Sequence, residues 1–273
     1  MRIYLNGNIK GSKLTDDILE PGFLFGWGVF ETLRIYRGKP VFLKDHIQRL
    51  KVGCEKILLR FPAVAFGKKI AILLRVNKLS DAHCRITIFK KKNEAGVLIS
   101  VTPLVQYSKS SYRNGFKAAV ASFTRSSRDF LIGVKSTSYL ENMIVRKTAE
   151  DRGKQEAIFL NESGFLTEGS RSNLFFVKGK TVYTPSLECG LLNGITRQKV
   201  IKIIKNNKLR LRLGRFKLGD LLSCDEAFFT SSLMEIMPLV EVDGESIKNG
   251  KPGEITRSLH RAYKLMINHR KFG

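Results

Sequence analysis

A lysine beside a run of hydroxyl-bearing residues is the first feature of this sequence that suits covalent chemistry. Lys135 follows Gly133-Val134 and precedes Ser136-Thr137-Ser138-Tyr139. Burial in a partly desolvated pocket disfavours the ammonium form of a lysine, and the free amine is then a nucleophile and a base. Because a lysine in a loop is more often a solvated side chain, the role of Lys135 depends on the rest of the chain.

A carboxylate and a helix start supply two further chemical groups. Glu168 lies in Thr167-Glu168-Gly169, and Asn173-Leu174-Phe175 follows it. Standing alone, Glu168 could equally be a turn carboxylate, so its role also depends on the rest of the chain. Gly194-Ile195-Thr196 comes directly before a predicted helix, whose N-terminal N–H groups and dipole favour an anion such as phosphate. Thr196 is equally suited to cap that helix.

The motifs of several other site classes are missing from the sequence. It has no HExxH, no GxSxG and no P-loop, which argues against hydrolases and nucleotide triphosphatases. Its four cysteines contain no CxxC pair, so we expect reduced, partly buried thiols and no metal site. These cysteines are Cys54, Cys84, Cys189 and Cys224.

The charge of the chain raises the question of a nucleic-acid partner. There are 48 basic and 24 acidic residues, for a formal net charge of +24. The segment from Lys199 to Lys217 holds eight Lys or Arg and no acid, but its apolar residues follow first helical and then alternating spacing. We interpret it as a packed element with a solvated basic face. A nucleic-acid-binding module without catalysis remains the remote alternative, since no zinc finger, RNP-type strand or GXXG clamp is present.

The elements that must position these residues alternate between short strands and helices, and a polar, turn-rich segment divides them. We therefore expect an α+β protein with a small N-terminal domain (1–106), a linker (107–115) and a larger C-terminal α/β domain (116–273) that carries Lys135. Strands are expected at Ile3 to Leu5, Val29 to Tyr36, Cys84 to Lys90, Gly96 to Pro103, Lys117 to Ser122, Glu156 to Leu160, Leu174 to Val177 and Thr181 to Tyr183. Helices are expected at Lys44 to Leu58, Gly67 to Asn77, Tyr139 to Arg152, Arg197 to Ile204 and Glu254 to Ile267.

Signals for a membrane or for export are missing as well. No stretch approaches the run of about 18 apolar residues that a membrane span needs, and the first residues form no apolar signal core. We expect a cytoplasmic protein that makes no use of a membrane.

Several separated segments, taken in order and spacing, resemble the class IV aminotransferases. These are enzymes of fold type IV that use pyridoxal 5′-phosphate, and they include branched-chain and D-amino-acid aminotransferases and aminodeoxychorismate lyase. The resemblance covers nearly the whole chain, and it implies a two-domain fold with the cofactor between the domains and a homodimer. The segments that carry it are Phe25 to Arg34, His46 to Leu50, Lys135 to Leu140, Leu166 to Leu174, Leu192 to Arg197 and Glu226 to Ser232.

The resemblance implies a role for each cofactor residue. Lys135 matches the lysine that forms the Schiff base, and Glu168 matches the carboxylate at the pyridine nitrogen. Tyr139 is the candidate for the ring 3-hydroxyl, although the loop between Lys135 and Tyr139 is one residue shorter than in typical branched-chain enzymes. The residues that match phosphate contacts are Arg49, Gly194, Ile195, Thr196, Ser231 and Ser232.

Residues on the substrate side are implied to come from the N-terminal domain. Phe25 and Phe30 match aromatic pocket positions, and equally suit the core of a strand. Arg34 and Arg85 match positions that hold substrate carboxylates in some members, and Lys90 lies near an arginine of the D-amino-acid enzymes. That subfamily's Arg-x-His pair is missing, as is the Gly-rich loop usual in branched-chain enzymes.

Two reactions therefore remain open. The first is transfer of an amino group between an amino acid and a 2-oxo acid, with Lys135 moving the α-proton. The second is a lyase reaction that releases pyruvate from 4-amino-4-deoxychorismate and leaves 4-aminobenzoate; Thr32 in Phe30-Glu31-Thr32 resembles the lyases. We favour the transaminase. The sequence alone leaves open the preferred enantiomer and side chain of the substrate.

Overall fold

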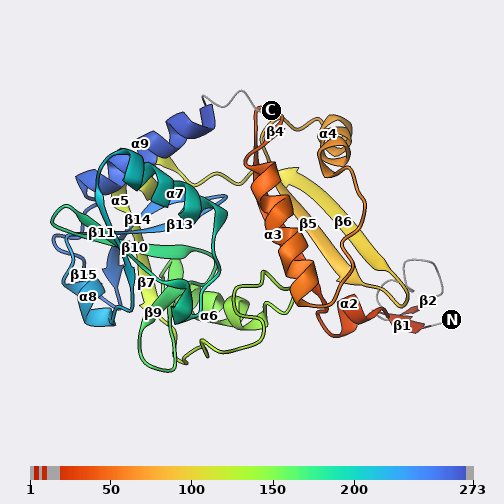
Figure 1. Cartoon of the computed structure of the whole chain (residues 1–273), viewed down its shortest axis with the longest axis horizontal. Helices are drawn as coiled ribbons and strands as arrows, with labels where there is room; N and C mark the ends of the chain where they lie inside the picture. The colour runs from red at the N-terminus through yellow and green to blue at the C-terminus, as the bar shows by residue number, and fades with distance from the viewer. Residues whose placement is uncertain (1–2, 6–7, 11–18, 269–273) are drawn as a thin grey trace. The chain divides into compact units, whose positions relative to one another are not determined.

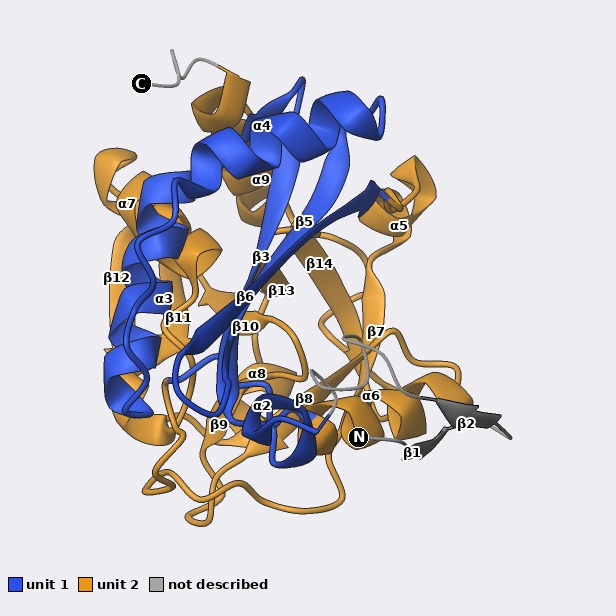
Figure 2. Ribbon diagram, turned by 90° about the vertical axis from the view of Figure 1, so that its right-hand side faces the viewer, with its two compact units in different colours: residues 1–104, 134–139 blue, residues 105–133, 140–273 orange. Residues whose placement is uncertain are grey.

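The structure is a computed structural model that describes residues 3–5, 8–10 and 19–268. Its chain divides into two compact units, shown in Figures 1 and 2. Unit 1 contains Met1–Leu104 and Val134–Tyr139, and unit 2 contains Val105–Gly133 and Leu140–Gly273. A short segment around the candidate lysine is thus grouped with the N-terminal part of the chain.

Unit 1 is built on an antiparallel sheet with the strand order β4-β3-β5-β6. Strand β3 has a buried polar residue, Glu31, among the apolar Val29, Leu33 and Ile35, and all four are buried on one side of the strand. The elements of this unit are β1 (Ile3–Leu5), β2 (Asn8–Lys10), α2 (Pro21–Leu24), β3 (Gly28–Tyr36), β4 (Lys39–Pro40), α3 (Leu43–Lys56), α4 (Phe66–Val76), β5 (Ala82–Lys90) and β6 (Ala95–Pro103).

Unit 2 is built on a nine-stranded mixed sheet with the path β12-β11-β10-β13-β14-β7-β8-β9. Strand β9 also pairs with β10 through Asn173 and Glu168, so the sheet closes on itself there. Its strands are β7 (Phe116–Val120), β8 (Glu156–Leu160), β9 (Leu166–Gly169), β10 (Asn173–Lys178), β11 (Thr181–Pro185), β12 (Arg210–Gly214), β13 (Glu226–Ser231), β14 (Glu235–Val242) and β15 (Glu245–Ser246). Its helices are α5 (Lys109–Asn114), α6 (Leu140–Asp151), the 3-10 turn η1 (Leu187–Cys189), α7 (Ile195–Asn206), α8 (Leu218–Leu222) and α9 (Glu254–Asn268).

Two apolar layers hold unit 2 together. One face of the sheet buries a large cluster that includes Leu174, Phe176 and Phe229. On the other face of β7 and β8, Val145 and Ala149 of α6 pack against Phe159. Elsewhere α7 and α9 lie side by side in Figure 1, and the hydroxyls of Thr196 and Tyr263 approach to 3.5 Å. This sheet carries Glu168 on β9 and Ser231 on β13, two of the residues that sequence analysis assigned to the cofactor, and α7 starts beside Asn173 of β10.

Most predicted elements occur within a few residues of their expected ends. The expected helix from Lys44 to Leu58 is α3, and the closing helix expected at Glu254 to Ile267 is α9. The basic segment forms the end of α7 and the edge strand β12, as its two periodicities predict. The mixed α/β, two-domain prediction is confirmed.

The domain boundary differs in detail from the expected one. Residues 107–115, expected to be a linker, belong to unit 2 and contain α5. Residues 134–139 pair with β3 instead of staying with the C-terminal unit, because Ser136 bridges Val29. Within the described residues, no helix has the length and apolarity to cross a bilayer.

Candidate active site

Backbone hydrogen bonds fix Lys135 in place beside β3. The Phe30 amide donates to the Lys135 carbonyl at 2.9 Å, and the Thr137 amide donates to the Gly28 carbonyl at 2.9 Å. The Thr137 hydroxyl adds a bond of 2.6 Å to the Gly26 carbonyl. Because the Lys135 carbonyl and the Thr137 amide are both bonded to β3, the backbone sets the direction of the Lys135 side chain, as a covalent catalyst requires.

Aromatic rings surround the amine of Lys135. Its Nζ lies 4.5 Å from the centre of the Phe30 ring and 5.2 Å from that of Tyr139. The two rings meet edge to face, with centres 5.3 Å apart. The Arg85 guanidinium stacks on the same Phe30 ring at 3.7 Å. Lys135, Tyr139, Phe30 and Arg85, all predicted site residues, therefore form one cluster.

The same face of the sheet carries two more predicted residues. Thr32 lies opposite Arg85 in the pairing of β3 with β5, and Arg34 lies opposite His83. Directly paired residues project to the same face, as do residues two apart along a strand. Phe30, Thr32 and Arg34 thus share a face with Arg85, which has its pKa lowered by burial. This face combines aromatic surface with two guanidinium groups.

Arg49 lies on the other side of β3, in an ion pair with buried Glu31. Its Nε donates to one carboxylate oxygen at 2.6 Å and its Nη2 to the other at 2.8 Å, while His46 Nδ1 lies 2.6 Å from Glu31. Burial works to raise the pKa of Glu31, but Arg49 and His46 outweigh it and lower that pKa to about 2. Burial lowers the pKa of His46, although the hydrogen bond and the charge of Glu31 act to raise it. The fork of two bonds fixes the plane of the Arg49 guanidinium.

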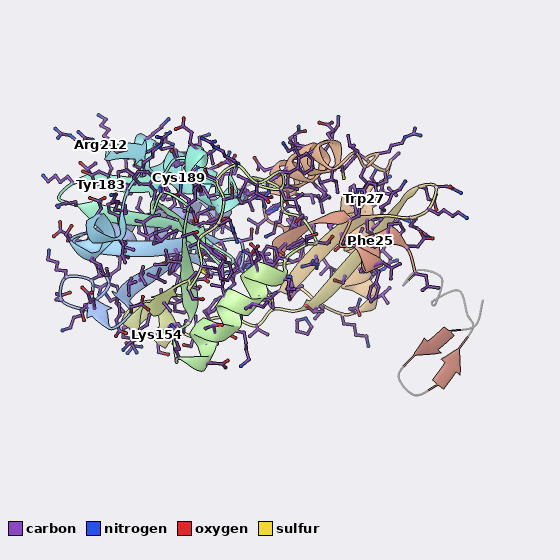
Figure 3. All side chains as sticks on the ribbon, turned by 90° about the horizontal axis from the view of Figure 1, so that it is seen from below. Phe25, Trp27, Lys154, Tyr183, Cys189 and Arg212 are labelled. Carbon is purple, nitrogen blue, oxygen red and sulfur yellow. The ribbon has the colours of Figure 1, made fainter. Side chains whose placement is uncertain are left out.

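Phe25 and Lys90 lie near the end of α2, around Trp27, in unit 1. Phe25 follows the last residue of α2 with 73% of its surface exposed, and Trp27 is labelled beside it in Figure 3. The Lys90 amine lies 6.0 Å from the Trp27 ring centre, and the Lys90 amide donates to the Trp27 carbonyl at 2.8 Å. Neither is part of the cluster of Lys135, Tyr139, Phe30 and Arg85.

In unit 2, Glu168 is held by three donors. One carboxylate oxygen accepts from the Asn173 amide group at 3.0 Å and from the Leu192 backbone N–H at 3.1 Å. The other accepts from Arg125 at 3.3 Å. Arg125 in turn donates to Asn142 at 3.0 Å and stacks on Phe159 at 3.9 Å. These contacts orient a carboxylate that has an adjacent cation.

The start of α7 adjoins the same group of residues. Gly194 is the N-cap and makes no side-chain cap, so the idea that Thr196 caps this helix is wrong: Thr196 lies in its first turn. A Cβ at position 194 would clash with the Asn173 carboxamide oxygen, so glycine lets the helix start approach Asn173 closely. The first N–H groups of a helix have no partners within it and suit an anion. Gly194 thus adjoins Asn173, which bonds Glu168, and Ile195 and Thr196 follow Gly194 in the first turn of α7.

Ser231 ends β13, and Ser232 follows it in the turn to β14. The Ser231 hydroxyl accepts a hydrogen bond from the Met234 amide at 3.3 Å, which holds the turn. Glu235 begins β14 with a φ of 57° and is buried, with His260 Nε2 at 2.7 Å from its carboxylate. The two serines therefore lie on a tightly restrained turn.

Sequence reasoning missed the groups that hold the predicted residues. A buried glutamate at Glu31 could be read from its place among apolar residues of β3, and His46 from its position three residues before Arg49. Arg125 had no such signal, because it lies in an irregular segment far from Glu168 in sequence. Long-range contacts of this kind appear only in the folded chain.

The sequence matches a known family and several characterised proteins over most of its length. The family model described as amino-transferase class IV matches residues 28–242. The chain is 33% identical to the aminodeoxychorismate lyase of Bacillus subtilis (strain 168), over 98% of this chain and 95% of the relative. It is 30% identical to the D-alanine aminotransferase of Bacillus licheniformis, over 98% of this chain and 97% of the relative.

The fold also matches that of solved structures. The crystal structure of a T.th. branched-chain amino acid aminotransferase with pyridoxamine 5′-phosphate matches with a TM-score of 0.87 and 25% identity. The match covers 99% of this chain and 95% of that chain.

Proposed function

The chain belongs to the amino-transferase class IV family, and from this we propose that it transfers an amino group between an amino acid and a 2-oxo acid with pyridoxal 5′-phosphate as cofactor. The observation that carries the proposal is Lys135, held by β3 with its amine against Phe30 and Tyr139. A lysine fixed in this way suits covalent attachment of an aldehyde.

The residues present fit the chemistry of that cofactor. A phosphate needs converging N–H donors, and Gly194 leaves the start of α7 free of any side chain at the point of closest approach to Asn173. A ring nitrogen needs a fixed carboxylate, and Glu168 has its orientation set by Asn173 and Leu192. When bound, pyridoxal phosphate supplies an electron-accepting ring that stabilises negative charge at the substrate α-carbon.

The candidate site residues would divide the binding of the cofactor and the proton transfer among them. Lys135 Nζ would hold the cofactor covalently, and as a free amine would take the proton from the substrate α-carbon and return it. The Glu168 carboxylate would keep a proton on the ring nitrogen. The Tyr139 hydroxyl would donate a hydrogen bond to the ring hydroxyl. The residues that would hold the phosphate are Gly194, Ile195 and Thr196 at the start of α7, Arg49, and the hydroxyls of Ser231 and Ser232.

Substrate recognition is proposed for the face that carries Phe30. Arg34 and Arg85 are suited to a carboxylate, since a guanidinium forms two parallel hydrogen bonds. Phe30 and Phe25 would contact the side chain of the substrate, Lys90 would offer a further cation, and Thr32 would lie beside Arg85. A homodimer and a cytoplasmic location stay predictions, the first of which sedimentation analysis tests.

The lyase reaction is the second candidate function. Two observations favour it: the 33% identity to an aminodeoxychorismate lyase, and Thr32 on the face that carries Arg85. In this reading Lys135 removes the proton whose loss expels pyruvate, and Thr32 assists that transfer.

Covalent trapping tests the shared part of both candidates. The purified protein is expected to be yellow, and reduction with borohydride should attach the cofactor to Lys135, as peptide mapping would show. Lys135→Ala is the matched variant that should lose the label, and Lys154→Ala the control that should keep it, since Lys154 pairs with Glu241 in unit 2. Label on a different lysine would contradict the proposal.

Single half-reactions separate the two candidates. The yellow protein is mixed with L- and D-amino acids without any oxo acid. A transaminase loses its yellow band with a good substrate and regains it when 2-oxoglutarate is added. A lyase releases pyruvate from aminodeoxychorismate over many turnovers while the band persists, and Thr32→Ala slows it. Persistent colour with pyruvate release would overturn our preference.

A further inference from the structure

Thr230 is a buried residue of β13 that has no role in the proposed site so far described. Its surface is 1% exposed. In the sheet it lies directly opposite Asn173 on β10, and Asn173 lies opposite Glu168 on β9. Paired residues project to the same face, so these three side chains form one row across the sheet.

The row lies on the face of the sheet where α7 and α9 begin, because Asn173 meets the start of α7, and Glu226, four residues before Thr230 on β13, caps α9. Phe175 and Phe228, two residues along β10 and β13 from Asn173 and Thr230, stack at 5.0 Å on that face. The alternate residues Leu174 and Phe229 belong to the apolar cluster on the opposite face. The Asn173 carboxamide meets Gly194 at the start of α7. Asn173 thus contacts the start of α7, and Thr230 lies next to Asn173 on the neighbouring strand β13.

The hydroxyl of Thr230 differs from other buried threonine hydroxyls. Thr184 donates to the Leu174 carbonyl at 2.8 Å, and Thr167 donates to the Phe159 carbonyl at 3.1 Å. Among the described residues, Thr230 Oγ1 is fully buried with no hydrogen-bond partner. A buried hydroxyl without a partner is costly, and valine would fill the same volume without that cost. A buried, unbonded hydroxyl in such a place points to a ligand.

We propose that the Thr230 hydroxyl donates a hydrogen bond to the cofactor phosphate, as a further contact beside those of the α7 start and the two serines. This inference rests on the proposed function. An anion is the expected acceptor because the helix start favours negative charge, and because Ser231 and Ser232 directly follow Thr230. Glu168, assigned to the ring nitrogen, lies on the far side of Asn173 in the row.

Three variants separate a ligand contact from a structural one. Thr230→Val removes the hydroxyl at constant volume, and Thr230→Ser keeps it. Thr184→Val is the control, because it removes a buried hydroxyl that has a partner in the chain. The full chain is freed of cofactor, and its melting temperature is measured. Thr230→Val should melt at or above the wild-type temperature, whereas Thr184→Val should melt below it.

Binding is then measured by titration with pyridoxal 5′-phosphate, pyridoxal and inorganic phosphate. Thr230→Val should lower the affinity for both phosphate-containing probes about tenfold or more, since a hydrogen bond to a charged group is lost. Affinity for pyridoxal should stay as in the wild type, and Thr230→Ser should bind all three like the wild type.

The results of these measurements distinguish failure of the Thr230 inference from failure of the proposed function. Unchanged affinity for pyridoxal 5′-phosphate in Thr230→Val would overturn the inference and leave the proposed function intact. An equal loss for pyridoxal, or a lower melting temperature without cofactor, would also overturn it, since either shows an effect other than a phosphate contact. A wild-type protein that binds inorganic phosphate through Thr230 but no pyridoxal 5′-phosphate would refute the proposed function alone. Binding of neither would refute both.

Discussion

Opposite charges hold Arg49 and Glu168, two of the charged residues that we assign to the cofactor. Arg49 is fixed by the two carboxylate oxygens of Glu31, and Glu168 has Arg125 beside it. In each pair the partner comes from a different element, so the fold sets the direction of the side chain. A residue held in this way loses little conformational entropy when a ligand binds, which favours affinity.

Glu31 gives a test of this arrangement at a single residue. Replacing it by Gln leaves Arg49 and His46 without a counter-charge in a buried site, and we expect a loss of about 2–4 kcal/mol in the free energy of unfolding at pH 7. Glu94→Gln, at an exposed position, is the control and should be neutral. Urea unfolding measures both, and Glu31→Gln should also weaken binding of pyridoxal 5′-phosphate if Arg49 binds its phosphate.

The pH dependence follows from the pKa of Glu31. A carboxyl whose pKa falls on folding, here from an ordinary 4.5 to about 2, adds stability above 4.5 and loses it as the pH drops through that range. The difference between wild type and Glu31→Gln should therefore be constant above about pH 5 and shrink below it. A constant difference down to the acid limit of the folded state would contradict the assignment.

Local sequence patterns predict most strands and helices but not the contacts between them. Strand β3 and helices α3 and α9 follow from alternating or helical spacing of apolar residues. Strand β9 was missed, because its four residues are all buried and pair with β8 through an irregular register. The binding of residues 134–139 to β3 depends on a partner more than 100 residues away, which no local pattern contains. The roles predicted for the candidate site residues depend on the family resemblance, because no local pattern assigns them.

Helix α9 begins at a cap that comes from a distant strand. Glu226 of β13 accepts from the Ile255 amide at 3.0 Å, the Thr256 amide at 2.8 Å and the Thr256 hydroxyl at 2.7 Å. A carboxylate at a helix N-terminus satisfies free N–H groups and interacts well with the helix dipole. A Cβ on Gly253 would overlap this carboxylate, so glycine is needed just before the helix.

A double-mutant cycle tests this cap. Glu226→Ala should cost about 1–2 kcal/mol of unfolding free energy in urea, as loss of a charged cap does. Gly253→Ala should cost a similar amount, because the new methyl group displaces the carboxylate. The two costs should not add, since Glu226→Ala removes the atoms that the methyl group meets. Glu245→Ala, exposed on β15, is the neutral control, and additive costs would refute the cap.

The chain carries a formal net charge of +24, and most of the basic side chains among the described residues are exposed. In the basic segment from Lys199 to Lys217, the α7 residues Val200, Ile203 and Ile204 are buried, whereas on edge strand β12 Leu211 is half-buried and Leu213 is exposed. Most of the basic groups of the segment are exposed, and Arg212 of β12 is labelled in Figure 3. Positive charge along an edge strand discourages pairing with another chain. This gives the segment a physical role within the fold that requires no nucleic acid.

The four cysteines report on the packing of the whole molecule, two in each unit. All four are free and buried: Cys54 and Cys84 in unit 1, Cys189 and Cys224 in unit 2. Burial raises the pKa of Cys54, Cys84 and Cys224 to about 12. At pH 8 only about one in ten thousand of these three thiols would be the reactive thiolate.

We therefore expect none of the four thiols to react with Ellman's reagent at pH 8 in the native protein, and all four to react in denaturant. Because each unit has its own buried cysteines, the two thiols of one unit should become reactive at the same urea concentration, which mass spectrometry of labelled peptides resolves. Whether the two units open together or apart is then read from the same titration. Rapid labelling of a thiol in the native protein, or separate transitions for Cys54 and Cys84, would mean that the core of a unit opens locally, against the packing described for it.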